Sequence, residues 1–265
     1  MGQMKRFDGR TVLLTGACGG FGRSIAHALA AEGANLVLSD YEPEPLMTLV
    51  AELQERHDCA VVAHAGDIAD ENTSETLVDL AVEHFSTLDI AINNAGIAQS
   101  FVRFHLIPSE EARRVLEVDL LGVFFAMKHQ LPVMERQHRK GKRKGAIVNI
   151  SSVAGLGGAP RLAVYSAAKH GVVGLTRTAA AEYAAKGIRV NAVCPSFART
   201  DMVTEMLSMS PADQEKAEAE LTRGVPMKRL AEVDEVVTAV LFAADPANSF
   251  MTGQAIGIDG GISAL

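Results

Sequence analysis

The chain has 265 residues, of which 48% are hydrophobic and 22% are charged, and its formal net charge is -7. This length and balance predict one globular domain over residues 1–265 and exclude a largely disordered chain. The acidic net charge argues against a nucleic-acid-binding protein, because neutralising phosphates needs a basic surface.

Short β-rich apolar runs alternate along the chain with longer segments of helical period. The expected strands are Arg10–Thr15, Asn35–Ser39, Ala60–Ala65, Leu88–Asn93, Ala146–Ser151, Ile188–Val193 and Ala255–Ile258. The expected helices are Gly20–Glu32, Pro43–His57, Glu71–Phe85, Ser109–Arg136, Val164–Ala185 and Glu232–Ala244. This alternation predicts an α/β fold with a parallel seven-stranded sheet that helices cover on both faces, because each crossover helix packs back on the sheet.

Two segments depart from this rhythm. Arg136–Lys144 is a short basic stretch that we interpret as a solvated surface turn without a function. Residues 196–225 form a long connection that contains Met202 and Met206. Long insertions at the ligand end of a sheet are often lids, so this connection is the candidate substrate loop.

No membrane-spanning segment or signal peptide is expected, because no run of about 18 apolar residues occurs and the first ten residues contain no apolar stretch. The cytoplasm is therefore the expected location. Cys18, Cys59 and Cys194 are widely spaced and form no Cys/His cluster, so we expect reduced thiols and no metal site.

A glycine-rich turn with the spacing G-x-x-x-G-x-G follows the first strand directly, with glycines at Gly16, Gly20 and Gly22. Glycines let the backbone approach a pyrophosphate, and the next helix offers free N–H groups and a positive dipole. Tight structural turns can also contain glycine clusters, so it is the position between strand and helix that favours dinucleotide binding.

Asp40 ends the second strand, eighteen positions after Gly22. This is close to the spacing at which an acidic residue binds the adenosine ribose hydroxyls. Its charge would repel a 2′-phosphate, and neither Ala17 nor Cys18 supplies a compensating cation, so NAD is favoured over NADP. The alternative role for Asp40 is a turn residue before Pro43.

Tyr165 and Lys169 lie four residues apart on one face of a predicted helix. An isolated tyrosine has a pKa of about 10, and a neighbouring ammonium group favours the phenolate, which is the effective base. Ser152 lies thirteen positions before Tyr165, at the C-terminal end of a strand. Open α/β sheets bind ligands at this edge, so the Ser152 hydroxyl is placed to orient a substrate oxygen.

A series of short motifs extends along nearly the whole chain. They are TGACGGFG, Asp40, Asp67-Ile68, Asn93 to Gly96, Ser152, YSAAK, Asn191 to Pro195 and TGQAIGIDGG. In this order and spacing the chain resembles the short-chain dehydrogenase/reductase family, in its compact single-domain branch. The resemblance implies a Rossmann-type, doubly wound sheet in the order 3-2-1-4-5-6-7. It also implies that Tyr165 is the acid/base, that Lys169 holds the nicotinamide ribose and that Ser152 orients the reacting oxygen.

The resemblance further implies a set of cofactor contacts. By position they are Gly16, Cys18, Gly20, Phe21, Gly22, Asp40, Tyr41, Asp67, Ile68, Asn94, Ala95, Gly96, Tyr165, Lys169, Pro195, Ala198 and Thr200. Asn94 to Gly96 could also form an ordinary turn, and Asp67 could equally cap the helix that begins near Glu71.

Three positions depart from the family pattern. Asp119 stands where the family usually has an asparagine that completes a proton relay with the lysine and water. A carboxylate accepts the same hydrogen bonds but adds charge near Lys169, so Asp119 either retunes the relay or has a purely structural role. Ser196 replaces the usual glycine after Pro195, and Phe21 replaces the common isoleucine of the glycine turn.

The residues expected to contact substrate are mostly small or apolar. They are Ser152, Ala154, Leu156, Tyr165, Phe197, Met202 and Met206. This lining favours a hydrophobic alcohol or ketone, such as a steroid-like, aromatic or acyl compound, over a sugar. The methionines would serve equally well to pack the loop onto the domain.

Three alternatives to this dehydrogenase remain from the sequence. One is a catalytically idle NAD(H)-binding sensor or structural subunit, and the intact Ser152, Tyr165 and Lys169 argue against it. The second is a sugar or polyol dehydrogenase. The third is an epimerase or dehydratase that uses the same tyrosine and a transient hydride, which the chain disfavours because it has little room for the substrate domain that such relatives usually add. The resemblance also implies a homotetramer, with the helices Ser109–Arg136 and Val164–Ala185 at one interface and the C-terminal strand at another.

Overall fold

A computed structural model describes residues 5–200, 203–204 and 214–264. Its strands form one parallel sheet in the order β3-β2-β1-β4-β5-β6-β7. The strands are β1 (Thr11–Thr15), β2 (Asn35–Asp40), β3 (Val61–Ala65), β4 (Ile90–Asn93), β5 (Gly145–Ile150), β6 (Ile188–Pro195) and β7 (Ala255–Ile258). The predicted single-domain, doubly wound fold and its strand order are therefore confirmed.

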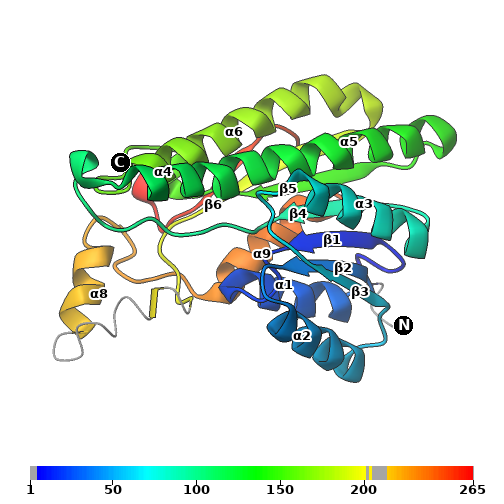
Figure 1. Ribbon diagram of the computed structural model, residues 1–265, viewed down its shortest axis with the longest axis horizontal. Helices are drawn as coiled ribbons and strands as arrows, with labels where there is room; N and C mark the ends of the chain where they lie inside the picture. Colours follow the sequence, from blue (N-terminus) through cyan, green and yellow to red (C-terminus); the bar gives the residue numbers. More distant parts are fainter. Residues whose placement is uncertain (1–4, 201–202, 205–213, 265) are drawn as a thin grey trace.

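Helices cover both faces of this sheet (Figure 1). They are α1 (Gly20–Ala31), α2 (Pro43–Arg56), α3 (Glu71–Phe85), α4 (Ser109–Leu116), α5 (Gly122–Gly141), α6 (Ala163–Tyr183), α8 (Gln214–Thr222) and α9 (Val233–Ala244). Successive residues of a strand point to opposite faces. Leu14 accordingly packs with residues of α1, α2 and α9, and its neighbour Leu13 packs with residues of α3, α5 and α6. The two hydrophobic cores lie on opposite sides of one sheet.

The segment expected as a single helix over Ser109–Arg136 is interrupted. Between α4 and α5, Glu117–Leu121 adopts a π-helical turn, and α5 then continues to Gly141. Asp119 lies within this turn and its side chain is completely buried. Single π turns inside helices are frequent at functional sites, because the wider turn changes the direction of the side chains that it carries.

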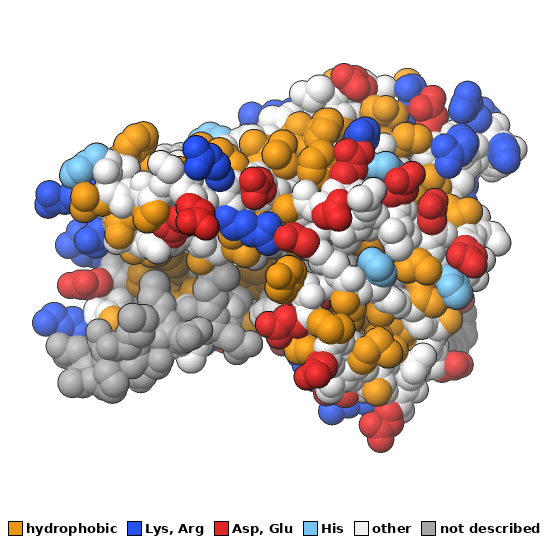
Figure 2. Space-filling view, viewed as in Figure 1, with side chains coloured by type: hydrophobic (Ala, Val, Ile, Leu, Met, Phe, Trp, Pro, Cys, Tyr) orange, Lys and Arg blue, Asp and Glu red, His pale blue; other side chains and the backbone are white. Residues whose placement is uncertain are grey.

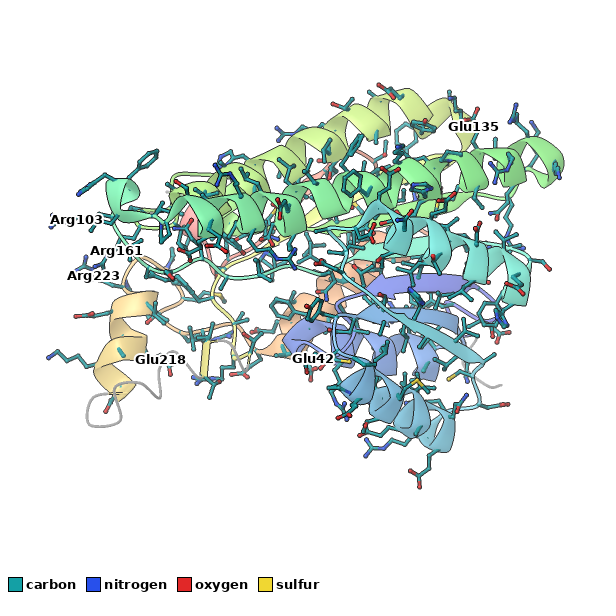
Figure 3. The ribbon with its side chains drawn as sticks, in the orientation of Figure 1. Glu42, Arg103, Glu135, Arg161, Glu218 and Arg223 are labelled. Carbon is teal, nitrogen blue, oxygen red and sulfur yellow. The ribbon has the colours of Figure 1, made fainter. Side chains whose placement is uncertain are left out.

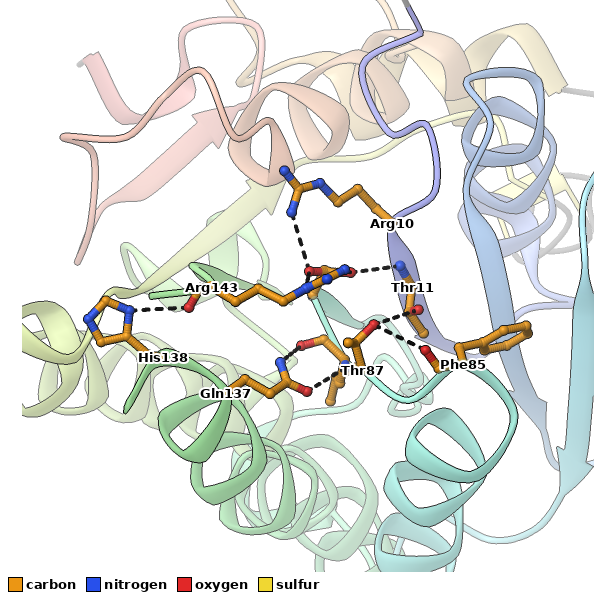
Figure 4. A network of polar contacts seen from close by, with 9 residues as sticks. Arg10, Thr11, Phe85, Thr87, Gln137, His138 and Arg143 are labelled. Atoms are coloured by element: carbon orange, nitrogen blue, oxygen red, sulfur yellow. Dashed lines mark hydrogen bonds and ion pairs between the residues drawn. The ribbon is translucent and has the colours of Figure 1, made fainter. Parts of the chain in front are cut away.

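The basic segment Arg136–Lys144 is largely exposed, but most of it is not a turn, because residues 136–141 form the C-terminal end of α5. Arg143 forms an ion pair with Asp89, the buried residue that precedes β4 (Figure 4). The same carboxylate accepts a hydrogen bond from the Thr11 N–H at 3.0 Å and lies 3.4 Å from Arg10 Nη1. Through the Asp89 carboxylate, Arg143 before β5 is thus connected to the start of β1 and the start of β4, at the amino edge of the sheet.

The structure describes part of the long connection at residues 196–225. Within it, Arg199 forms ion pairs with Glu218 of α8 at 2.6 Å and with Glu232 at 3.1 Å. Met202 and Met206 lie outside the described residues. None of the described helices is long and apolar enough to cross a membrane.

Candidate active site

The glycine turn is packed tightly against the loop that follows β4. Gly16 has a φ of 63°, and a Cβ there would lie 2.8 Å from the Cα of Ala95. Asn94 Nδ2 donates to the carbonyl oxygens of Gly16 at 2.9 Å and Thr15 at 3.0 Å. Position 16 therefore requires glycine both for its left-handed backbone and for the close approach.

The turn leads into α1, which begins without a side-chain cap. Its N-cap residue is Gly19, and its first turn contains no acidic residue. The first N–H groups of α1 consequently have no side-chain acceptor, and the positive end of the helix dipole is not neutralised locally. A Cβ on Gly20 would lie 2.8 Å from the Cβ of Thr200, so a side chain at position 20 would collide with Thr200. A glycine backbone at an uncapped helix N-terminus fits a pyrophosphate group.

Asp40 ends β2 beside this turn. Its Oδ2 accepts a hydrogen bond from the Cys18 N–H at 2.7 Å, and its Oδ1 accepts one from the Tyr41 N–H at 2.7 Å. The carboxylate therefore lies where the second strand meets the glycine turn. Burial, and then the Asp40 carboxylate, raise the pKa of the Cys18 thiol to about 12, so Cys18 is a neutral thiol at physiological pH.

Asp67 and Ile68 follow β3 at the same edge of the sheet. Asp67 Oδ2 pairs with Arg114 of α4 at 2.9 Å, and its Oδ1 accepts from the Ala69 N–H at 3.0 Å. The alternative role of Asp67 as the cap of α3 is wrong, because Asp70 accepts the Asn72 N–H at 3.0 Å in that position. Ile68 is buried.

Asn94, Ala95 and Gly96 form the loop that follows β4. The N–H groups of Asn94 and Ala95 each donate to Thr15 Oγ1 at 3.1 Å. Gly96 lies beside Lys169, because a Cβ there would be 3.2 Å from Lys169 Nζ. These contacts join the loop to the glycine turn on one side and to α6 on the other.

Lys169 is 4% exposed and lies between two acceptors. Its Nζ is 3.3 Å from Asp119 Oδ2 and 3.4 Å from the Ile150 carbonyl oxygen. Asp119 Oδ1 accepts a hydrogen bond from the Ile97 N–H at 2.8 Å. Burial opposes the charge on Lys169, but the Asp119 carboxylate and then Tyr165 outweigh it, so the pKa of Lys169 is raised. The ammonium group is charged at neutral pH.

Tyr165 lies one turn before Lys169 on α6 and is partly buried. Lys169 Nζ is 5.4 Å from the centroid of the Tyr165 ring. The i, i+4 spacing that the sequence indicated therefore brings the phenol and the ammonium group together on one helix face. The π turn at Asp119 supplies the third ionisable group of this cluster from a different helix.

Ser152 follows β5, which is held against α6. Its Oγ accepts from the Ala154 N–H at 3.1 Å and donates to the Pro195 carbonyl oxygen at 3.4 Å. Ser151 Oγ donates to the Lys169 carbonyl oxygen at 2.9 Å, and Ser166 Oγ donates to the Ala154 carbonyl oxygen at 2.8 Å. The segment that carries Ser152 is thus tied directly to the first two turns of the helix that carries Tyr165 and Lys169.

The other residues expected at the substrate site differ in their surroundings. Ala154 is 5% exposed, and Leu156 packs partly against the small core around Cys194. The Phe197 carbonyl oxygen accepts from the Ala231 N–H at 3.0 Å, and Ala198 forms an isolated β-bridge with Ala231. Figure 2 shows hydrophobic side chains in a hollow beside the layer that contains α4.

Gln99 is a buried site residue that sequence reasoning missed. It is 3% exposed, and its Oε1 accepts from the N–H groups of Val164 and Tyr165 at 3.0 Å each. No motif marks it, because it lies in an irregular loop and its partners are 65 and 66 positions away. Only the three-dimensional structure brings these groups together.

A parallel sheet in this order, with a glycine turn at its carboxyl edge, defines a Rossmann-type dinucleotide-binding fold. Residues 16–263 match the family described as enoyl-(acyl carrier protein) reductase. Cis-4-hydroxycyclohexanecarboxylate dehydrogenase of Sinomonas cyclohexanicum is 39% identical over 98% of both chains. The solved structure of levodione reductase is 37% identical with a TM-score of 0.91, over 98% of this chain and 99% of its own. The chain belongs to the short-chain dehydrogenase/reductase family.

Solved relatives contain either nicotinamide nucleotide. NAD+-bound xylitol dehydrogenase is 31% identical with a TM-score of 0.89, over 97% of this chain and 100% of its own. ElxO with NADP bound is 30% identical with a TM-score of 0.88, over 97% of this chain and 99% of its own.

Proposed function

We propose that this protein is an NAD-dependent oxidoreductase that interconverts a secondary alcohol and a ketone, with Tyr165 as the acid–base group. The observation that carries this proposal is the cluster of Tyr165, Lys169 and Asp119 beside Gly96, at the carboxyl edge of the sheet. A buried ammonium group next to a phenol favours its deprotonated form, and burial strengthens the interaction.

In the oxidising direction, the phenolate of Tyr165 takes the proton of the substrate hydroxyl as the carbinol carbon loses a hydride. In the reducing direction, the phenol of Tyr165 returns that proton to the carbonyl oxygen. The bound nicotinamide supplies the hydride acceptor or donor. Ser152 orients the substrate oxygen and Lys169 stabilises the phenolate, and Lys169 would also bind the nicotinamide ribose.

The residues at the glycine turn support a dinucleotide, and Asp40 favours NAD over NADP. Gly16, Gly20 and the N–H groups at the start of α1 would hold the pyrophosphate, and Asp40 would bind the adenosine ribose. A 2′-phosphate would lie near the Asp40 carboxylate and be repelled.

The proposed substrate is a hydrophobic secondary alcohol or its ketone, and a cyclic aliphatic alcohol is the first class to test. Two observations support this class. Relatives of this chain include enzymes named for cyclic substrates, among them hydroxycyclohexanecarboxylate at 39% identity and cyclohexanol at 36% identity. Ala154 and Leu156, which follow Ser152 by two and four positions, are apolar and would suit a hydrocarbon ring. We further propose a homotetramer, which light scattering of the purified protein would report as four times the chain mass of 28.1 kDa.

The test is a fluorescence titration with NADH and NADPH, followed by a screen of cyclic, aromatic, steroid and polyol alcohols with NAD+. We expect tighter binding of NADH and turnover of cyclic secondary alcohols. Preference for NADPH would overturn the assignment of Asp40. If only polyols are turned over, the substrate is a polyol and not a hydrophobic alcohol. NADH binding without turnover of any alcohol would favour an idle nucleotide-binding protein.

A further inference from the structure

Gln99 uses its whole side-chain amide to connect its own loop with the start of α6 at the candidate active site. Its Oε1 accepts two hydrogen bonds, from the N–H groups of Val164 and Tyr165. Its Nε2 donates to the carbonyl oxygens of Ser100 at 3.2 Å and Arg161 at 3.3 Å. A side-chain amide has two acceptor sites and two donor hydrogens, so this buried group is fully satisfied.

These contacts supply the N-terminal cap that α6 lacks in its own sequence. The N-cap residue is Leu162, whose side chain cannot accept a hydrogen bond. Val164 and Tyr165 are the second and third residues of the helix, and theirs are the N–H groups that a capping side chain ordinarily satisfies. Gln99 therefore provides the cap from a distant loop, and one of the two capped residues is Tyr165.

Gln99 also fixes the backbone just before α6. Arg161 has a φ of 72°, a left-handed conformation that costs free energy for a residue other than glycine. The hydrogen bond from Gln99 Nε2 to the Arg161 carbonyl oxygen holds this conformation. Figure 3 shows Arg103, from the segment that follows Gln99, and Arg161 at the same end of the molecule.

The loop that carries Gln99 is itself anchored to the candidate cofactor site. It begins with Asn94, which contacts the glycine turn, and continues through Ile97, whose N–H donates to Asp119. A displacement of this loop would therefore reach the first turn of α6 through Gln99. The chain of contacts runs from the glycine turn, through the loop, to the backbone of Tyr165.

We propose that Gln99 is a positioning residue that couples the loop after β4 to the first turn of α6 and so sets the position of the Tyr165 phenol. This inference rests on the proposed function of Tyr165 as the acid–base group. Gln99 does not touch the reacting atoms in this role. It acts through the two N–H groups that it accepts.

The test compares Gln99→Met with a matched variant at the opposite edge of the sheet. Gln137 makes two hydrogen bonds of 2.8 Å with the backbone of Leu88, so Gln137→Met removes a similar side-chain amide far from Tyr165 (Figure 4). Both variants are expected to lose stability. Only Gln99→Met is expected to lower kcat, by about tenfold or more, because small displacements of a reacting group cost large factors in rate.

Four readouts separate positioning from general destabilisation: KM, Kd, the isotope effect on kcat and amide hydrogen exchange. In Gln99→Met, KM for the alcohol and Kd for NADH should stay within about threefold, and the deuterium isotope effect on kcat should rise as hydride transfer becomes limiting. Hydrogen exchange at the Val164 and Tyr165 amides should accelerate in Gln99→Met and not in Gln137→Met. Gln99→Glu retains an acceptor oxygen for the Val164 and Tyr165 N–H groups but loses the donated bonds to Ser100 and Arg161, so its kcat should fall between those of the wild type and Gln99→Met. This second variant also serves if Gln99→Met does not fold.

The inference is overturned if the Gln99 variants retain wild-type kcat, whether or not exchange at α6 accelerates, or if Gln137→Met lowers kcat equally. Its failure is distinguishable from failure of the proposed function. If the wild-type protein and Tyr165→Phe turn over the alcohol equally, the assignment of Tyr165 fails. If Tyr165→Phe is inactive and Gln99→Met is fully active, only the role of Gln99 fails.

Discussion

Asp119 places a buried carboxylate 3.3 Å from the Lys169 ammonium, where the family usually has a neutral amide. The contact with the Ile97 N–H uses the other carboxylate oxygen and would survive in asparagine. The charge itself is therefore the distinguishing feature of this residue. It offsets part of the positive field that Lys169 exerts at Tyr165.

Asp119→Asn should move the pH profile of alcohol oxidation to lower pH. The Asp119 carboxylate is the main factor that raises the pKa of Lys169 against burial. Without it the ammonium group should lose its proton at lower pH, so the alkaline limb of the rate profile should move down. Initial rates between about pH 7 and pH 11 measure this limb. A profile that stays in place or moves upward would assign Asp119 a purely structural role.

Asp40→Asn should weaken the discrimination between NADH and NADPH. Asparagine can still accept the hydrogen bond from the Cys18 N–H at the glycine turn, although its amide NH2 cannot replace the oxygen that accepts from the Tyr41 N–H, and the charge is removed. The ratio of the two dissociation constants should fall about tenfold, equivalent to about 1.4 kcal/mol. Glu42→Gln is the matched control, because Glu42 is an exposed carboxylate two positions on, and it should change the ratio less than about threefold. An unchanged ratio in Asp40→Asn would show that another group sets the preference.

At the scale of the elements, the alternation of apolar runs and helical segments predicted every strand of the described sheet, with no strand end displaced by more than two residues. The π turn at Asp119 was not predictable in this way. We predicted one helix over Ser109–Arg136, whereas the π turn within this segment brings Asp119 to Lys169 and Ile97, which lie in distant parts of the sequence. Gln99 was missed for the same reason, because a side chain in an irregular loop has no periodicity to reveal its partners.

The amino edge of the sheet supports a prediction about stability. Arg143→Met removes the main ion-pair partner of Asp89, whose carboxylate is almost fully buried. It should lower the free energy of unfolding by about 2 kcal/mol, because the Asp89 charge would remain buried with fewer partners. Arg139→Met, from the same basic segment but exposed, should change it by less than about 0.5 kcal/mol. Urea unfolding of both variants gives the comparison, and equal effects would contradict the role assigned to Arg143.

On the scale of the whole molecule, the two edges of the sheet have different tasks. The carboxyl edge gathers the glycine turn, the loop after β4, Ser152 and the start of α6, and the amino edge contains the Asp89 network. Substitutions at the amino edge should therefore change stability without changing kcat. The sequence predicted the chemistry of the carboxyl edge because its motifs are local. It did not predict the contacts that hold those motifs together, such as Asp67 with Arg114, because they join distant segments.

The central claim is that Tyr165 is the acid–base group of a nicotinamide-dependent alcohol oxidation. Its most direct test measures the oxidation of a cyclic secondary alcohol with NAD+ by the wild-type protein and by Tyr165→Phe, together with the NADH affinity of each. We predict that kcat falls at least about a hundredfold in Tyr165→Phe, the range expected for loss of a general acid–base group, while Kd for NADH changes less than about threefold. Turnover by Tyr165→Phe at the wild-type rate, with NADH affinity unchanged, would contradict the account.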